Sequence, residues 1–235
     1  STFSSSENFV ISQTGNYTNE AGIARFLGGL TFNGSTFTVN AGSLDGIVTF
    51  STNPSQSVGG TASPAVFNNL TLNNSNGLAL TTSVQINGTL NLSNGIMNTG
   101  PSSLILGQGS TVGSISNSSY VFGNVANTFA STYNSRQFPM GSDNRYRLVE
   151  LRGRTASGTA TLVCNLIAGD AAYVASFNPP LEKVSSVRYY QFTNSSGVTV
   201  QIDKINNCRI NNDDGVGLLV SNATLRFVTV VNSPG

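Results

Sequence analysis

The chain has 235 residues, of which 38% are hydrophobic and only 9% are charged, and its formal net charge is +1. The hydrophobic share is that of a folded protein, and the small net charge argues against a nucleic-acid partner or an anionic membrane surface. No apolar run approaches the roughly 20 residues that a membrane-spanning helix needs, so we predict no membrane span.

The first residues suggest a secreted product. The chain begins at Ser1 without a visible signal peptide, as expected of an exported protein whose signal has been removed. The polar stretch STFSSSEN then leads into Phe9, Val10 and Ile11, a short apolar run. We therefore expect an extracellular or cell-surface location, and we treat this run as a candidate for self-association.

Residues 1–135 form the first predicted region, which holds only four charged side chains: Glu7, Glu20, Arg25 and Asp45. Apolar-polar-apolar triplets recur about 20 residues apart, which is the spacing of one turn of a three-sided parallel β-helix. The triplets that show this spacing begin at Leu30, Val48, Leu70 and Leu90, and the intervals Leu78 to Ile96 and Val84 to Leu104 are nearly the same. The alternative is an antiparallel sandwich with short hairpins, which the Asn-Gly pairs at Asn33, Asn76, Asn87 and Asn94 also allow.

A parallel stack also accounts for the missing charge between Gly46 and Ser135, where no Asp, Glu, Lys, Arg or His occurs. Equivalent residues of successive turns lie roughly 4.8 Å apart, so a stacked row of like charges would repel itself. Rows of Asn, Thr and Ser can instead hydrogen-bond along the stack. The same scarcity of charge leaves the ends of the stack poorly protected against docking.

Residues 136–235 form a second predicted region with a different surface, and we place the boundary near Asn134 to Arg136. The segments YRLVELRG, GTATLVCNL, VRYYQFTNSSGVTVQI and NATLRFVTVV are longer, carry outward charges and are separated by turn signals. This pattern predicts an antiparallel β-sandwich of about six to eight strands. The fold class we expect is therefore all-β, a parallel β-helix followed by an antiparallel β-sandwich.

The junction contains SSYVFGNVANTF followed by QFPMGSDNRYRLVEL, after the repeats FNNLTLNNSNGLAL and INGTLNLSNGIM. This combination resembles large secreted surface proteins of Bacteroidota and related bacteria, over roughly Phe67 to Leu151. The resemblance implies β repeats and a β-sandwich, export by the type IX system, and a role as an adhesin or surface-layer component. The C-terminal sorting domain that is usual in that class is not apparent in this sequence.

Catalytic and metal-binding chemistry is poorly represented, so we predict no enzyme, no metal and no cofactor. The chain has no histidine, which excludes Ser-His-Asp and Cys-His arrangements. Asp213 and Asp214 resemble a turn more than a calcium loop, Glu150 and Asp170 have no spacing typical of a glycosidase pair, and Asp143 is expected to form a structural salt bridge with Arg145 or Arg147.

Two further features leave alternatives open. Cys164 and Cys208 are either a disulfide between two strands of the sandwich or two buried thiols. Tyr189, Tyr190 and Phe192 form either a platform for a glycan or part of a core.

The leading functional hypothesis is an extracellular structural protein that forms a homopolymer, either a filament or sheath subunit or an adhesin module, assembled by β-strand contacts. The alternative is a carbohydrate-binding or carbohydrate-cleaving β-helix protein with surface glycans as partners. The residues predicted to mediate self-association lie near both ends of the sequence: Phe9, Val10, Ile11, Leu225, Phe227 and Val228. Both segments could instead pair within their own chain.

Overall fold

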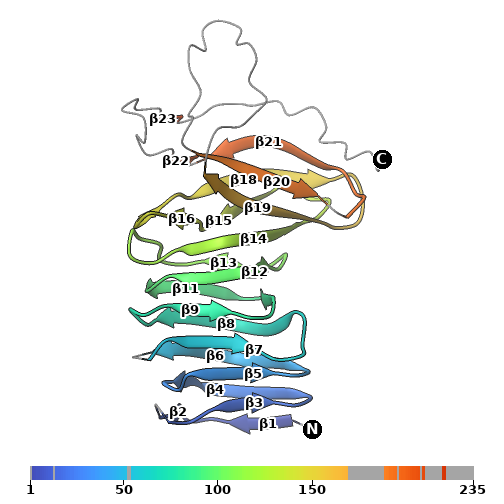
Figure 1. Cartoon of the computed structure of the whole chain (residues 1–235). Coiled ribbons are helices and arrows are strands. Elements are labelled where there is room, and N and C mark those ends of the chain that lie inside the picture. Colours follow the sequence, from blue (N-terminus) through green and yellow to red (C-terminus); the bar gives the residue numbers. More distant parts are fainter. Residues whose placement is uncertain are drawn as a thin grey trace, which may run out of the picture.

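In the computed structural model of this chain, residues 2–12, 14–51, 54–168, 188–194, 196–206, 208–209 and 219–220 are described. This part of the chain is all β, as the sequence predicts, and contains no helix. Parallel strands are stacked into a column that starts at the N-terminal end, and antiparallel strands lie across the other end of the column (Figure 1).

The strands of the column are β1 (Thr2–Ser5), β2 (Phe9–Ile11), β3 (Tyr17–Asn19), β4 (Ile23–Phe32), β5 (Thr36–Val39), β6 (Ser43–Ser51), β7 (Gln56–Gly59), β8 (Ala65–Asn73), β9 (Leu78–Leu80), β10 (Val84–Ile86), β11 (Thr89–Asn94), β12 (Met97–Leu106), β13 (Thr111–Val112) and β14 (Val121–Phe129). They are followed by β15 (Asn134–Phe138), β16 (Gly141–Ser142), β17 (Arg145–Tyr146), β18 (Val149–Thr155), β19 (Ala160–Ala168), β20 (Arg188–Asn194), β21 (Val200–Asn206), β22 (Cys208–Arg209) and β23 (Leu219–Val220).

The column is a parallel β-solenoid with three sides. Side 1 consists of β1, the first halves of β4, β6 and β8, then β10 and the second halves of β12 and β14. Side 2 consists of β2, the second halves of β4, β6 and β8, then β11 and β13. Side 3 consists of β3, β5, β7, β9 and the first halves of β12 and β14.

The spacing of the apolar triplets predicts the register of side 2. Leu30 pairs with Val48, Val48 with Leu70, and Leu70 with Leu90. Val84 likewise pairs with Leu104 on side 1. One expected pair is wrong by a residue, because Leu78 pairs with Met97, which is buried, while Ile96 lies at the preceding corner.

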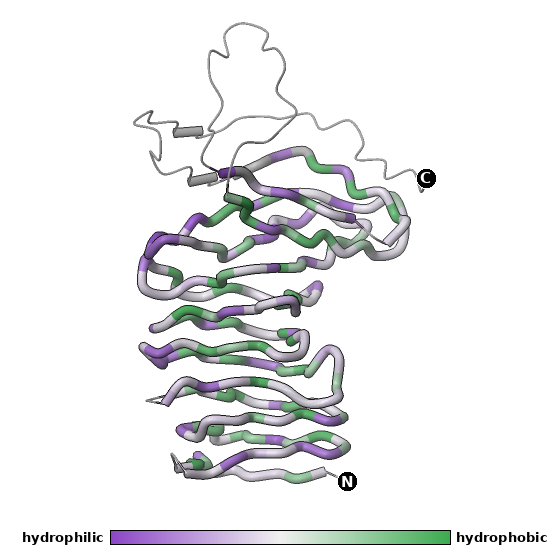
Figure 2. The backbone as a smooth tube through the Cα atoms, viewed as in Figure 1, coloured by the Kyte–Doolittle hydropathy of each residue, from purple (hydrophilic) through white to green (hydrophobic). Residues whose placement is uncertain are grey.

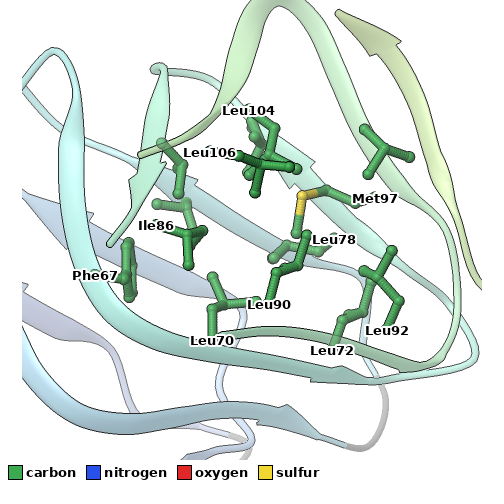
Figure 3. Packing of buried hydrophobic residues seen from close by; sticks show 14 of the residues in the cluster. Phe67, Leu70, Leu72, Leu78, Ile86, Leu90, Leu92, Met97, Leu104 and Leu106 are labelled. Atoms are coloured by element: carbon green, nitrogen blue, oxygen red, sulfur yellow. The ribbon is translucent and has the colours of Figure 1, made fainter. Parts of the chain in front are cut away.

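Alternation along each strand places apolar side chains inside the column, and Figure 2 shows this alternation along the tube. The interior changes character along the stack. Towards the N-terminal end it is aromatic, with rings in contact among Phe32, Phe37, Phe50 and Phe67. Further along it is aliphatic, and Figure 3 shows this part of the core with Leu70, Leu72, Leu78, Ile86, Leu90, Leu92, Met97, Leu104 and Leu106.

Polar side chains stack along the outside of the column. Thr31, Thr49 and Thr71 follow one another in register on side 2. Bonds between turns join such rows: the Thr89 amide donates to the Asn69 side chain (2.8 Å), and the hydroxyls of Thr89 and Thr111 lie 3.1 Å apart. Along the uncharged stretch, hydrogen bonds of this kind therefore join successive turns in place of ion pairs.

The direction of pairing changes at β14. This strand is parallel to β12 on one edge and antiparallel to β19 on the other, and β20 follows β19. A second antiparallel sheet has the order β15-β18-β21. The predicted sandwich of six to eight strands is not confirmed, since the antiparallel sheets of the described residues are small. Their buried side chains, among them Phe129 and Phe138, join the core of the solenoid, so this end of the column is covered.

The junction motif forms the tight hairpin β16–β17. Asp143 and Asn144 both adopt positive φ (52° and 56°), as a two-residue turn of this kind requires. Asp143 forms a structural ion pair, as expected, and its carboxylate lies 2.6 Å from the guanidinium of Arg188 in β20. Hydrogen bonding to the Arg188 guanidinium lowers the pKa of Asp143 below its ordinary value. The contact links the hairpin to a strand 45 positions later in the chain.

Candidate assembly surface at the first turn of the solenoid

The first turn of the solenoid exposes side chains that the next turn buries. Phe3 pairs in register with Ala24, and Phe9 pairs with Leu30. Ala24 and Leu30 are buried, whereas Phe3 is 52% and Phe9 is 45% exposed. Both phenylalanines therefore occupy core positions whose outer side no described strand covers.

The backbone of this turn is open as well. Among the described residues, β1 and β2 each pair only with β4, and β3 pairs only with β5. One edge of each strand thus presents amide and carbonyl groups without a neighbouring strand. Edges of this kind accept further strands unless charge, proline or a cap prevents it.

Exposed hydrophobic side chains concentrate near this end. Of the seven large ones that the described part of the chain exposes, six lie between residues 3 and 47: Phe3, Phe9, Val10, Ile23, Leu27 and Ile47. The seventh is Phe122 in β14, at the far end of the column. A gathering of exposed apolar side chains marks a contact surface more often than scattered ones do. We call these six side chains the apolar end.

Aromatic contacts hold the apolar end in place. The Phe3 ring lies 6.4 Å from Phe9 and 5.8 Å from Phe26, measured between ring centroids. Tyr17 stacks on Phe37 at 4.4 Å, and its partial burial raises the pKa of its phenol to about 12. Because Phe3 rests on the buried Phe26 ring and Phe9 rests on Phe3, the surface is preformed, and binding to it costs little ordering entropy.

The two parts of the chain carry opposite charge. Residues 1–135 hold three carboxylates and one arginine, whereas residues 136–235 hold ten Lys and Arg and seven Asp and Glu. In the first turns, the guanidinium of Arg25 lies 3.6 Å from the Asp45 carboxylate, and Glu7 and Glu20 are exposed. The end with the apolar surface is therefore weakly acidic, and the opposite part of the chain is weakly basic.

The structure describes half of the residues predicted to mediate self-association. Phe9 and Val10 are exposed, while Ile11 is partly buried against the core. All three pair with β4 of their own chain, which was the alternative interpretation of this segment. Leu225, Phe227 and Val228 lie outside the described residues. Self-association through either segment stays a prediction.

Sequence reasoning missed four members of the apolar end: Phe3, Ile23, Leu27 and Ile47. Phe3 could have been found, because it precedes Ala24 by about the same 20 residues that separate the other rungs. Leu27 and Ile47 lie at corners of the column beside glycines, where neither side-chain alternation nor the 20-residue spacing marks which way they point.

The other predicted sites offer less chemistry. Within the described ranges, no group of three or more His, Cys, Asp or Glu could hold a metal ion. Asp170, Asp213 and Asp214 fall outside these ranges. Cys164 is fully buried in β19, but the side chain of Cys208 is not described, so the disulfide stays a prediction.

Two of the three predicted platform aromatics are engaged in packing. The Tyr190 hydroxyl donates to the carbonyl oxygen of Arg147 at 2.8 Å, and the Phe192 ring lies 5.4 Å from the Phe138 ring. The side chain of Tyr189 is not described. These contacts favour a core role for Tyr190 and Phe192 over a glycan platform.

The chain matches no protein-family model, no curated protein and no solved structure. In the part that the structure describes, no helix is long and apolar enough to cross a membrane. The molecule's own surface is therefore the guide to its function, and the apolar end holds six of the seven large hydrophobic side chains that the described residues expose.

Proposed function

We propose that this protein is an extracellular structural protein whose copies associate end to end through the apolar end, as subunits of a filament or sheath or as modules of an adhesin. The observation that carries the proposal is the exposure of Phe3 and Phe9 at core positions of the first turn. A solenoid needs a cap at each end to stay monomeric. The antiparallel strands cover one end, no described strand covers the other, and we propose that a neighbouring copy covers it.

The asymmetry of the column supports an open chain rather than a closed dimer. One end is apolar and weakly acidic, and the other is covered by β-strands in a weakly basic region. A contact between two different surfaces repeats without closing unless its rotation happens to form a ring, so it builds a fibre. The resemblance to secreted surface proteins of Bacteroidota agrees with such a role outside the cell.

The test is assembly as a function of protein concentration, measured by analytical ultracentrifugation and negative-stain electron microscopy. We expect the full chain to sediment well above its 24.5 kDa monomer mass and to form elongated particles. A variant with Phe3→Lys and Phe9→Lys should remain monomeric, because each lysine would have to be desolvated in the contact.

The matched control is Phe122→Lys, since Phe122 is 50% exposed, almost as much as Phe3, but lies in β14. It should assemble like the unmodified chain. The proposal fails if the unmodified chain is monomeric at about 1 mM, where even weak contacts of this kind would form. It also fails if Phe122→Lys abolishes assembly as completely as the double variant does.

A further inference from the structure

Side 2 of the solenoid sets strict sequence requirements for any strand that adds below β2, that is, on the edge of β2 that faces away from β4. Its first inward column is Phe9, Leu30, Val48, Leu70 and Leu90, and its second is Ile11, Phe32, Phe50, Leu72 and Leu92. The column between them points outward and contains Val10 followed by Thr31, Thr49, Thr71 and Asn91. A strand that continues the stack in parallel must therefore read large apolar, any residue, large apolar.

We propose that the strand that adds below β2 is Leu225-Arg226-Phe227 of a second copy, with Leu225 next to Phe9 and Phe227 next to Ile11. The inference rests on the proposed end-to-end association and names the segment that makes the contact. These three residues lie outside the described part of the chain, and it is their order in the sequence that meets the requirement of side 2. That order repeats Leu30-Thr31-Phe32, the triplet that already lies against β2 within the chain.

The charge of the middle residue fits the same placement. Arg226 would lie next to Val10 in the outward column of side 2, and none of the five residues already in that column is charged. The surrounding end carries the exposed carboxylates of Glu7 and Glu20. These carboxylates attract an arginine at this position, and no other residue of the outward column repels it.

The segment cannot reach β2 of its own chain, which is why a second copy is required. Leu219–Val220 pairs with β22, and β22 lies against β18 beyond the covered end of the column. Six strand pairings on side 1 separate β14 from β1, which is about 29 Å at roughly 4.8 Å each. The five residues from Val220 to Leu225 span at most about 17 Å when fully extended.

The decisive experiment is complementation between two full-length variants. The donor variant exchanges neighbours, Leu225→Arg with Arg226→Leu, which keeps composition and net charge but places arginine in the inward column. The acceptor variant is Phe9→Lys. Each should be monomeric alone, since each lacks one half of the contact, and circular dichroism should show the β-sheet spectrum of the unmodified chain for both.

Mixed in equal amounts, the two variants should form a dimer and nothing larger. Only one productive contact remains in the mixture, because the acceptor variant keeps the intact segment Leu225-Arg226-Phe227 and the donor variant keeps the intact first turn. Ultracentrifugation should show a doubling of mass. If the donor variant alone assembles as well as the unmodified chain, another segment makes the contact, and the inference fails while the proposed function survives. A mixture that stays monomeric also overturns the inference. If the unmodified chain does not assemble, both fail.

Discussion

Replacement of Gln56 by leucine should destabilise the solenoid strongly, although glutamine is polar and leucine suits a core. Gln56 is only 2% exposed. Its side-chain amide donates to the carbonyl oxygens of Phe32 at 2.8 Å and Gly34 at 2.9 Å, and its own oxygen accepts from the amide of Asn74 at 2.9 Å. The side chain thus joins three successive turns inside the column.

The magnitude follows from these three bonds. Each buried hydrogen bond contributes about 1 kcal/mol net, and a partner left unsatisfied costs about 1–3 kcal/mol. Leucine fills a volume similar to that of glutamine, so little cavity is created, and the three lost bonds together should cost at least about 3 kcal/mol. For a chain of this size, 1 kcal/mol corresponds to about 2–4 °C in Tm, so Tm should fall by at least about 6 °C.

The assay is thermal unfolding followed by circular dichroism, with Gln85→Leu as the matched control. Gln85 lies in the same solenoid, but its amide donates to the exposed side chain of Asn87, so the change should cost less than about 0.5 kcal/mol. A Gln56→Leu protein that melts within about 2 °C of the unmodified chain would refute the reasoning. Equal destabilisation by Gln85→Leu would do so as well.

Three further predictions concern packing, pH and the cysteines. Gly42→Ala should destabilise the column in thermal melts, because the φ of Gly42 is 84° and an added Cβ would overlap the carbonyl oxygen of Gly22 in the preceding turn. Gly109→Ala should be tolerated, since the nearest atom to its added Cβ, the carbonyl oxygen of Asn87, lies 3.9 Å away. Burial raises the pKa of the Tyr17 phenol to about 12, so its contribution to the free energy of unfolding is complete below pH 10 and is lost between pH 10 and 12. Between pH 9 and pH 11.5, the free energy of unfolding should therefore change by about 1–2 kcal/mol less in Tyr17→Phe than in the unmodified chain, as measured by thermal melting. If Cys164 and Cys208 form a disulfide, thiol titration of the unfolded, unreduced chain should detect no reactive group, and reduction should cost roughly 3–4 kcal/mol.

The solenoid could be predicted from the sequence, although the Asn-Gly pairs also allowed an antiparallel sandwich. Strict alternation fixes which side chains face inward, and a 20-residue interval fixes which of them stack, so the pairing of Leu30, Val48, Leu70 and Leu90 could be predicted without coordinates. The absence of charge over the same stretch agreed with that stacking. These features are readable because each depends on residues that are close in sequence or regularly repeated.

The surface at the ends of the repetitive stretch could not be predicted from the sequence and required the folded structure. Phe9 and Leu30 each begin an apolar-x-apolar triplet and pair in register, yet Phe9 is exposed and Leu30 is buried, because burial depends on whether a further strand lies beyond. Asp143 forms an ion pair with Arg188, which lies 45 positions later in the sequence, because β19 and β20 return the chain to the junction. A periodic sequence specifies the interior of a stack. The exposure of its ends depends on whether a further strand covers them, and its long-range polar contacts depend on where the chain returns.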